Sequence, residues 1–352
     1  MVVEQRGLES APPEASPHRR RRLGLAGLVA GLAVAGVLSL VIGTRSLTLA
    51  EVWQGLFGDP GTDQRLTEIT LIVHTLRIPR TVLAVVAGIA LGVAGALIQG
   101  HTRNPIADTG LLGVNAGASF AVVLSVYLFG LQNPIQYMWF AFLGAAAAGV
   151  VVFGLSSLGR GSGNPLTLVL AGQGVTIFLA AMTHAVALSD KQSLDVLRFW
   201  NAGSVQGVGY DVIWTAAGFI VVGIVLALIN LPALNLLNLG DDVARGLGVN
   251  IVAGRTVGVV AVTLLAGAAT AACGPIAFLG LMVAHVARWM TGPDYRWMVP
   301  YAGLLGAVVL LVGDVAGRLV VRPAELQAGI VIALLGAPFF AALVWLGKFR
   351  QA

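Results

Sequence analysis

Charged residues are scarce in this chain. They make up 11% of its 352 residues, whereas a soluble domain carries about 25%, and the mean hydropathy is +0.88. The deficit runs along the whole chain, so lipid is expected to replace water as its main solvent. Alternating ten-residue strands are missing too, which argues against a β-barrel. The composition therefore favours an all-α integral membrane protein.

Cysteine and lysine are almost absent as well. Cys273 stands alone, which excludes an intrachain disulfide and a cysteine-based metal framework. A P-loop needs Gly-x-x-x-x-Gly-Lys-Ser/Thr, and neither lysine, Lys191 or Lys348, lies in that pattern. No ATP site of this kind is therefore present. The net charge of +5 lies in short loops and forms no extended basic face, so we expect no nucleic-acid partner.

Aromatic residues are few, at 7%, whereas there are 46 glycines. Small residues suit helices that pack backbone to backbone in lipid, as do the pairs Gly88/Gly92 and Gly113/Gly117, each spaced by four. Apolar runs near the length that a bilayer requires predict ten transmembrane helices. They lie at residues 23–43, 80–100, 111–130, 136–158, 166–188, 211–231, 256–273, 276–290, 299–317 and 327–346. The pair around Gly274-Pro275 is open to a second interpretation, one span and one broken span.

The predicted domain organisation is one polytopic membrane domain, residues 23–346, between tails at 1–22 and 347–352. Ten spans place both tails in the cytoplasm, and this orientation leaves more Lys and Arg residues inside than outside. Residues 44–74 and 189–209 are then external connections, and 232–254 is the long internal loop. Membrane lipid is the surrounding partner.

Several motifs carry more information than hydropathy. The second span begins at Arg77-Ile78-Pro79-Arg80, and Arg103-Asn104-Pro105 follows it. Further motifs are Leu197-Arg198-Phe199-Trp200, Gly274-Pro275-Ile276-Ala277-Phe278, Asp314-Val315-Ala316-Gly317-Arg318 and Gly336-Ala337-Pro338. Over residues 35–346 the chain resembles the permease subunits of binding-protein-dependent ABC importers for ferric siderophores and cobalamin. Within them it looks most like the ferric-enterobactin permeases. Ala284 and Gln327 stand where that family usually has proline.

The resemblance implies a type II ABC importer permease fold, with an inverted repeat of spans two to five against seven to ten. It also implies the partners: a dimer of ABC ATPase subunits that binds the ATP, a second permease subunit (identical or paralogous), an extracytoplasmic siderophore-binding protein, and the ferric siderophore. No cofactor is expected in this chain. The implied location is the bacterial cytoplasmic membrane.

Four arginines are predicted on the external side, at Arg77, Arg80, Arg318 and Arg322. Their positions alone fit cations that snorkel to the lipid headgroups. The alternative is a cationic rim, because each guanidinium can hold a carboxylate through two parallel hydrogen bonds. The resemblance implies this second role, docking to glutamates of the binding protein, for Arg77, Arg80 and Arg318, with weaker support for Arg322.

The internal loop contains Leu239-Gly240-Asp241-Asp242-Val243-Ala244-Arg245-Gly246-Leu247-Gly248. Its two aspartates fit the start of a short helix, and Gly246 or Gly248 could end it. An ordinary amphipathic connector is the plain alternative. The resemblance implies a coupling helix that contacts the ATPase, and the residues assigned to it are Asp241, Asp242, Ala244, Arg245, Leu247 and Gly248.

Other site chemistries find little support. His101, His184 and His285 are scattered without the spacing of a helical metal site, and no metal ligands are predicted. Asp314 and Glu325 lie near the ends of spans, which argues against a proton relay. We therefore expect a transport subunit without catalytic activity, in an ATP-driven ferric siderophore importer. Cobalamin or haem import is the close alternative, and secondary transport or a membrane-embedded enzyme are the alternatives from other classes.

Overall fold

The computed structural model describes residues 17–345 except 60, 132 and 158–164. Most of the predicted N-terminal tail and the whole C-terminal tail therefore lie outside the described residues. The chain forms the helices α1 (Pro17–Val41), α2 (Leu49–Phe57), α3 (Gln64–Leu71), α4 (Ile78–Thr102), α5 (Val114–Phe129), α6 (Pro134–Ser157), α7 (Pro165–Ser189), α8 (Lys191–Asn201), α9 (Tyr210–Leu237), α10 (Asp241–Gly246), α11 (Ile251–Cys273), α12 (Leu279–Thr291), α13 (Tyr295–Val320) and α14 (Ala328–Trp345). A π-helix, η1 (Ile72–Arg77), joins α3 to α4, and a 3-10 turn, η2 (Thr109–Leu112), precedes α5.

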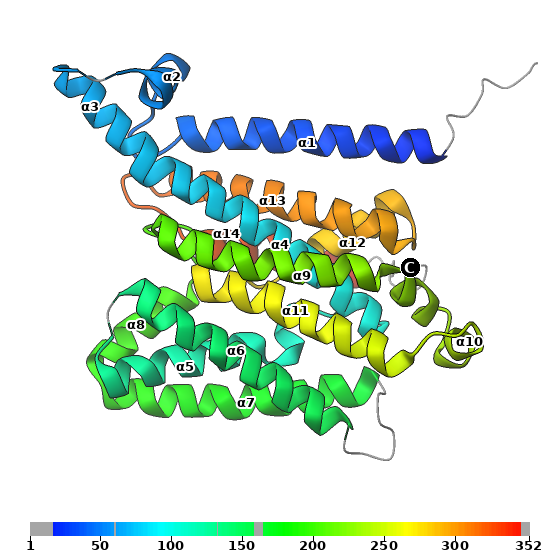
Figure 1. The fold of residues 1–352 in the computed structure, drawn as a ribbon. Helices are drawn as coiled ribbons and strands as arrows, with labels where there is room; N and C mark the ends of the chain where they lie inside the picture. The colour runs from blue at the N-terminus through cyan, green and yellow to red at the C-terminus, as the bar shows by residue number, and fades with distance from the viewer. Residues whose placement is uncertain (1–16, 60, 132, 158–164, 346–352) are drawn as a thin grey trace, which may run out of the picture.

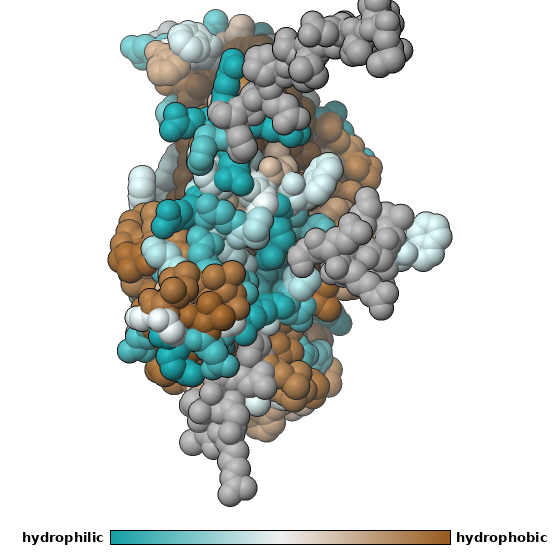
Figure 2. All heavy atoms as spheres, turned by 90° about the vertical axis from the view of Figure 1, so that its right-hand side faces the viewer, coloured by the Kyte–Doolittle hydropathy of each residue, from teal (hydrophilic) through white to brown (hydrophobic). Residues whose placement is uncertain are grey.

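The long helices lie side by side in one bundle (Figure 1). Helices α2, α3 and α8 lie at one end of it, and α10 lies at the other end, where α1 begins. We call these the α8 end and the α10 end. Seven helices of the described residues are long and apolar enough to cross a membrane. Viewed onto the α10 end, hydrophilic residues run across the surface between apolar flanks, as expected where a membrane protein meets water (Figure 2).

Helix α4 lies in the centre and contacts α9, α11, α12 and α13. Its glycines allow this. A Cβ on Gly88 would lie 2.6 Å from Cα of Ala307, and one on Gly92 would lie 2.1 Å from the carbonyl oxygen of Ala302, both on α13. The prediction that this glycine pair permits close helix contact is confirmed. Helix α1 lies at the edge of the bundle and packs mainly on α13.

All ten predicted apolar segments are helical, but they differ in length. Helix α12 has 13 residues and α5 has 16, which gives about 20 and 24 Å at 1.5 Å per residue, less than the hydrocarbon thickness of about 30 Å. The prediction of a full span at residues 276–290 was therefore wrong, and the broken-span interpretation describes α12 better. Gly274 and Phe278, with φ of 73° and 65°, turn the chain between α11 and α12.

The same break occurs earlier in the chain. Helix α4 ends before Arg103, whose φ is 48°, and Gly113, with φ of 70°, precedes the short helix α5. Helix α5 then packs on α6 and α7, as α12 packs on α13 and α14. Because α4 and α11 run in opposite directions along the bundle (Figure 1), α4–α7 and α11–α14 match the predicted inverted repeat.

The predicted connections contain more structure than expected. Residues 44–74 form α2, α3 and the start of η1, and residues 189–209 include α8. Helix α2 begins with a capping box between Thr48 and Glu51. At the α10 end, α9 continues through Pro232 to Leu237 and α11 begins at Ile251, so the predicted loop at 232–254 is shorter, with α10 in its middle.

Candidate docking and coupling sites

A buried ionic cluster lies at the α8 end, where α4 and α13 meet. Nε of Arg80 on α4 lies 3.0 Å from both carboxylate oxygens of Asp314 on α13, and its Nη2 donates to the same carboxylate at 2.8 Å. The third nitrogen of Arg80, Nη1, donates to Glu325 at 2.6 Å. Arg318 lies one turn after Asp314 and donates to it from Nε at 3.1 Å. One carboxylate thus lies between two guanidinium groups.

The same cluster holds the end of α1. The last carbonyl groups of any α-helix lack partners within the helix. Here Nη1 of Arg318 donates to the carbonyl oxygens of Ser39 and Ile42, at 2.8 Å each, and Arg77 donates to Ile42 and, at 2.7 Å, to the carbonyl oxygen of Arg45. Arginines of η1 and α13 therefore supply the hydrogen bonds that end the first span.

The structure brings the four predicted docking arginines to one end but does not form an exposed rim from them. Arg77, Arg80 and Arg318 are buried, with exposed fractions of 7%, 9% and 0%. Arg322 is exposed, and it donates two long hydrogen bonds, at 3.3 Å each, to the carbonyl oxygen of Gly43 and to Oγ of Ser46. Of the four, only Arg322 is exposed in this conformation, while the other three hydrogen-bond within the bundle.

The sequence places Asp314 and Glu325 near the ends of spans, but it does not predict that they pair with these arginines. Glu325 lies in the loop before α14, where it also accepts a hydrogen bond from Thr44 at 2.7 Å. Burial acts to raise the pKa of Glu325, but the hydrogen bonds from Arg80 and Thr44 and the nearby positive charges outweigh it and leave the pKa below its ordinary value. Glu325 is therefore ionised at neutral pH. The Asp314–Arg318 spacing of four was the one local signal of this pairing.

The α10 end carries the second candidate site. Asp241, at the start of α10, accepts hydrogen bonds from Arg103, after α4, and from Arg255 on α11 at 2.8 Å. Arg103 also donates from Nε to the carbonyl oxygen of Leu237 at 3.0 Å. Ala244 is fully buried. Asp241 thus joins the start of α10 to α11 and to Arg103, which in turn binds the end of α9.

Helix α10 ends in a Schellman motif. Gly248, with φ of 83°, donates to the carbonyl of Arg245 at 3.0 Å, and Val249 donates to that of Ala244 at 3.0 Å. The prediction of a glycine that ends this helix is confirmed for Gly248, whereas Gly246 is its last residue.

The predicted coupling residues divide between two faces of α10. Asp241 and Ala244 face the bundle, as their partners and burial show. The outer surface carries an ion pair, Asp242–Arg245, at 3.2 Å. It also carries three exposed apolar residues: Leu239, Val243 and Leu247. Val243 was not among the predicted residues, although its spacing of four from Leu247 would have identified it; Leu239 lies before the helix, next to Gly240, whose φ is 117°. These residues form an exposed apolar surface on an otherwise polar end of the bundle.

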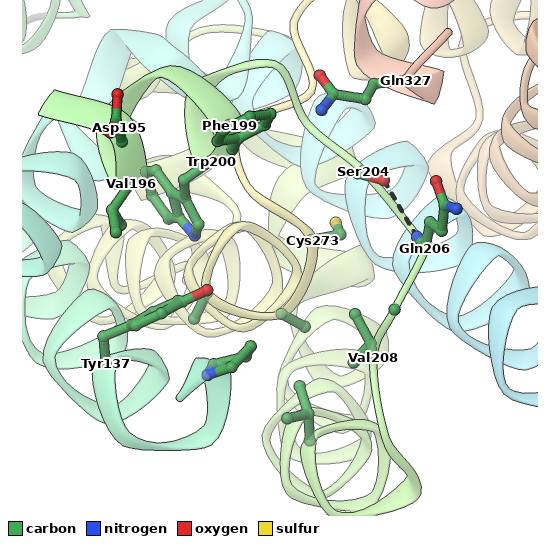
Figure 3. Close-up of a pocket in the computed structure, with 15 residues that line it drawn as sticks. Tyr137, Asp195, Val196, Phe199, Trp200, Ser204, Gln206, Val208, Cys273 and Gln327 are labelled. Carbon is green, nitrogen blue, oxygen red and sulfur yellow. Dashed lines mark hydrogen bonds between the residues drawn. The ribbon is translucent and has the colours of Figure 1, made fainter. Parts of the chain in front are cut away.

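A cavity of about 490 Å³ opens near the α8 end, between α6, α8, α9 and α11. Figure 3 shows Tyr137 and Trp200 with their polar atoms toward it, and Ser204, Gln206 and Gln327 on its opposite side. The thiol of Cys273 lies between these two sides, but donates to the carbonyl oxygen of Ala269 at 2.8 Å. The lining is mostly apolar and aromatic, and Asp195 is its one charged residue. No group of three or more metal-ligating side chains occurs among the described residues.

A comparison with protein families decides the class of the protein. Residues 31–346, most of the chain, match the model of the FecCD transport family. The chain belongs to that family. It is a multi-pass membrane permease, which accounts for the apolar bundle with two polar ends.

Known FecCD proteins resemble this chain over nearly its whole length. It is 41% identical over 324 residues to the ferric enterobactin transport system permease protein FepD of Escherichia coli, covering 92% of this chain and 95% of that protein. It is 39% identical to the Fe(3+)-citrate import system permease protein YfmD of Bacillus subtilis, covering 88% and 91%. It is 36% identical to the hemin transport system permease protein HmuU of Yersinia pestis, covering 92% and 95%.

The fold is also found among solved structures. A transporter described as metal-chelate type, in an inward-facing conformation, matches with a TM-score of 0.79 and 25% identity, over 92% of this chain and 99% of that one. The expected resemblance to siderophore permeases, and the expected ABC importer permease fold, are thereby confirmed.

Proposed function

We propose that this protein is the membrane-spanning subunit of an ATP-driven importer that carries a ferric siderophore across the bacterial cytoplasmic membrane. The observation that carries the proposal is the 41% identity, over nearly the full length, to a ferric enterobactin permease. The sequence has no P-loop lysine, so the ATP is bound by a separate ATPase dimer, and this subunit has no catalytic activity of its own.

The two ends of the bundle fit the two protein partners of such an importer. The α8 end is proposed to face the extracytoplasmic space and a siderophore-binding protein, with Arg322 exposed there and Arg77, Arg80 and Arg318 behind it. The α10 end is proposed to face the cytoplasm, with both termini. Leu239, Val243 and Leu247 would then enter a groove of the ATPase, since an exposed apolar group on a polar surface gains by leaving water. A second permease subunit completes the pore.

Uptake of iron-55 tests the proposal. A strain that lacks this gene should lose uptake of one iron-55 siderophore and keep its other iron routes, and the wild-type gene should restore it. Uptake should continue with a protonophore while ATP is held constant, and should stop when ATP is depleted. Inhibition by the protonophore alone would support a secondary transporter instead.

Haem is the second candidate substrate, because one relative at 36% identity is a hemin permease. The same strain should be given hemin as its only iron source. Growth on hemin with loss of siderophore uptake supports the siderophore assignment, and the reverse result supports haem.

A further inference from the structure

Helix α2 presents an apolar stripe that no other described residue covers. Leu49, Trp53 and Phe57, each four residues apart, are exposed by 66%, 67% and 70%. The rings of Trp53 and Phe57 contact each other, with centroids 4.6 Å apart. At 100° per residue these three positions form one line along the helix. The stripe is therefore a continuous surface.

The opposite side of α2 is firmly attached to the protein. Val52 and Gly55 are buried, and a Cβ on Gly55 would lie 2.9 Å from Val73 and 3.0 Å from Ile69. Thr48 and Glu51 cap the helix start, and Glu51 binds Arg65 of α3 at 2.7 Å. The stripe thus belongs to a helix whose orientation is fixed by its packing.

Helix α2 lies at the level where the first two spans end. Its buried Val52 belongs to an apolar cluster against which Leu40 and Val41, at the end of α1, and Ile78, at the start of α4, are packed. The headgroup region begins where the apolar segments of the spans end, so α2 lies at its depth.

The surroundings of α2 also point to lipid. In Figure 1, α2 lies beyond the end of α1, on the same outer side of the bundle. The exposed face of α1 is apolar, with Val34, Val37 and Leu38 on its surface. On another helix, α9, Tyr210 donates to the carbonyl of His74 at 3.0 Å, and Trp214 is exposed one turn farther in. Aromatic residues at this level on separate helices are typical of a membrane interface, where their amphipathic rings are favoured.

We propose that the Leu49–Trp53–Phe57 stripe of α2 inserts into the headgroup layer of the outer leaflet and anchors the external end of the first two spans to phospholipid. The helix would lie in the interface plane with its apolar side toward the acyl chains, as amphipathic interfacial helices do. This inference rests on the proposed orientation of the chain in the membrane, but it is independent of the substrate that is transported.

Fluorescence quenching in liposomes tests the proposal. The full-length permease carrying Trp53→Cys, labelled with an NBD fluorophore, is reconstituted in phosphatidylcholine and phosphatidylglycerol vesicles without other subunits. Gln54→Cys is the matched control, because Gln54 is also exposed but lies about 100° away around the helix. Wild-type protein gives the background, since its one cysteine, Cys273, is buried.

The label at position 53 should be quenched several-fold more strongly than that at 54 by lipids with a nitroxide on the headgroup or high on the acyl chain. Aqueous iodide should quench it several-fold less. Equal iodide quenching at both positions would overturn the proposal. Two other results would also overturn it. Protection of position 53 from iodide that appears only after a binding protein is added would assign the stripe to that partner. Protection from iodide without any quenching by nitroxide lipids would assign the stripe to a contact with another permease copy.

Discussion

Arg80 and Asp314, separated by 234 residues in the sequence, form a buried ion pair that joins α4 to α13. Asp314 also accepts from Arg318, so this carboxylate lies between two buried guanidinium groups, and Glu325 pairs with the first of them. An ion pair away from water stabilises little in total, because desolvation offsets the attraction, but removal of one partner leaves an uncompensated charge. Asp314 is therefore the residue on which this end of the bundle depends most.

Asp314→Asn is expected to destabilise the protein by about 3–5 kcal/mol, the usual cost of breaking a buried pair from one side. The melting temperature of the detergent-purified protein, followed by size-exclusion chromatography after heating, measures this. Asp242→Asn is the control, because the Asp242 side chain is 99% exposed and should leave the melting temperature unchanged. Equal melting temperatures for both variants would show that the cluster does not support the fold.

Glu325 gives this cluster a pH dependence. Its pKa is lowered in the folded protein, so its contribution to stability is complete above the pKa of an unfolded glutamate, about 4.3, and is lost as the pH falls through the lower folded value. Stability should thus hold at neutral pH and decline below about pH 4. Glu325→Gln should reduce this decline in melting temperature. The same slope in both proteins would assign the acid sensitivity to other carboxylates.

The orientation can be tested with introduced cysteines. Thr62→Cys, exposed between α2 and α3, should react with an impermeant maleimide added outside intact cells, and Asp242→Cys should react only after the membrane is opened. Thr62 is preferred to its neighbour Asp63, because Asp63 caps α3. Labelling of position 242 in intact cells would reverse the proposed topology.

The apolar helices were predictable because lipid demands long apolar segments, and the sequence records these directly. The break before α12 was foreseen as an alternative, from Gly274-Pro275. The burial of Arg77, Arg80 and Arg318 could not be predicted, because most of their partners are distant in sequence. Both roles considered for these arginines, docking and snorkelling, require an exposed side chain. Helix α2 has a signal in the sequence, the capping box of Thr48 and Glu51. It was not predicted because a polar stretch between two spans usually forms a loop.

Arg322 offers the cleanest test of docking, because it is exposed and pairs with no carboxylate among the described residues. Arg322→Glu should slow association with the binding protein and change its salt dependence, since a rim charge acts mainly on the association rate. An exposed pair contributes about 0.2–1 kcal/mol, so the loss of affinity should be modest. Biolayer interferometry on the permease in nanodiscs would measure it.

Lys191→Glu, on α8 at the same end, controls for a general change of charge. If the Arg322→Glu protein associates with the binding protein at an unchanged rate at low salt, Arg322 contacts lipid headgroups and not the binding protein. Charge reversal at Arg77, Arg80 or Arg318 is expected to unfold the protein first, because these residues are buried, so their binding must be measured on the folded fraction.

Leu247 tests the proposed coupling site at the α10 end. The residue is exposed, and with Val243 it forms the apolar side of α10, next to the exposed Leu239 that precedes the helix. Leu247→Asp would place an unpaired charge in a desolvated groove, which is costly, and should abolish co-purification of the ATPase. Leu247→Ala should weaken it less, because the truncation removes contact without adding a charge. Binding to the extracytoplasmic protein should remain normal in both variants.

The folded state should be the same in both Leu247 variants, because the contacts that hold α10 in place come from Asp241 and Ala244 on its other face. Binding-protein-stimulated ATP hydrolysis in liposomes gives the second measurement, and it should fall in the same order as co-purification. If Leu247→Asp and a deletion of residues 241–248 both leave hydrolysis and co-purification intact, α10 is only a connector. If instead Leu247→Asp keeps the ATPase bound but stops the hydrolysis, the helix transmits motion without providing the affinity.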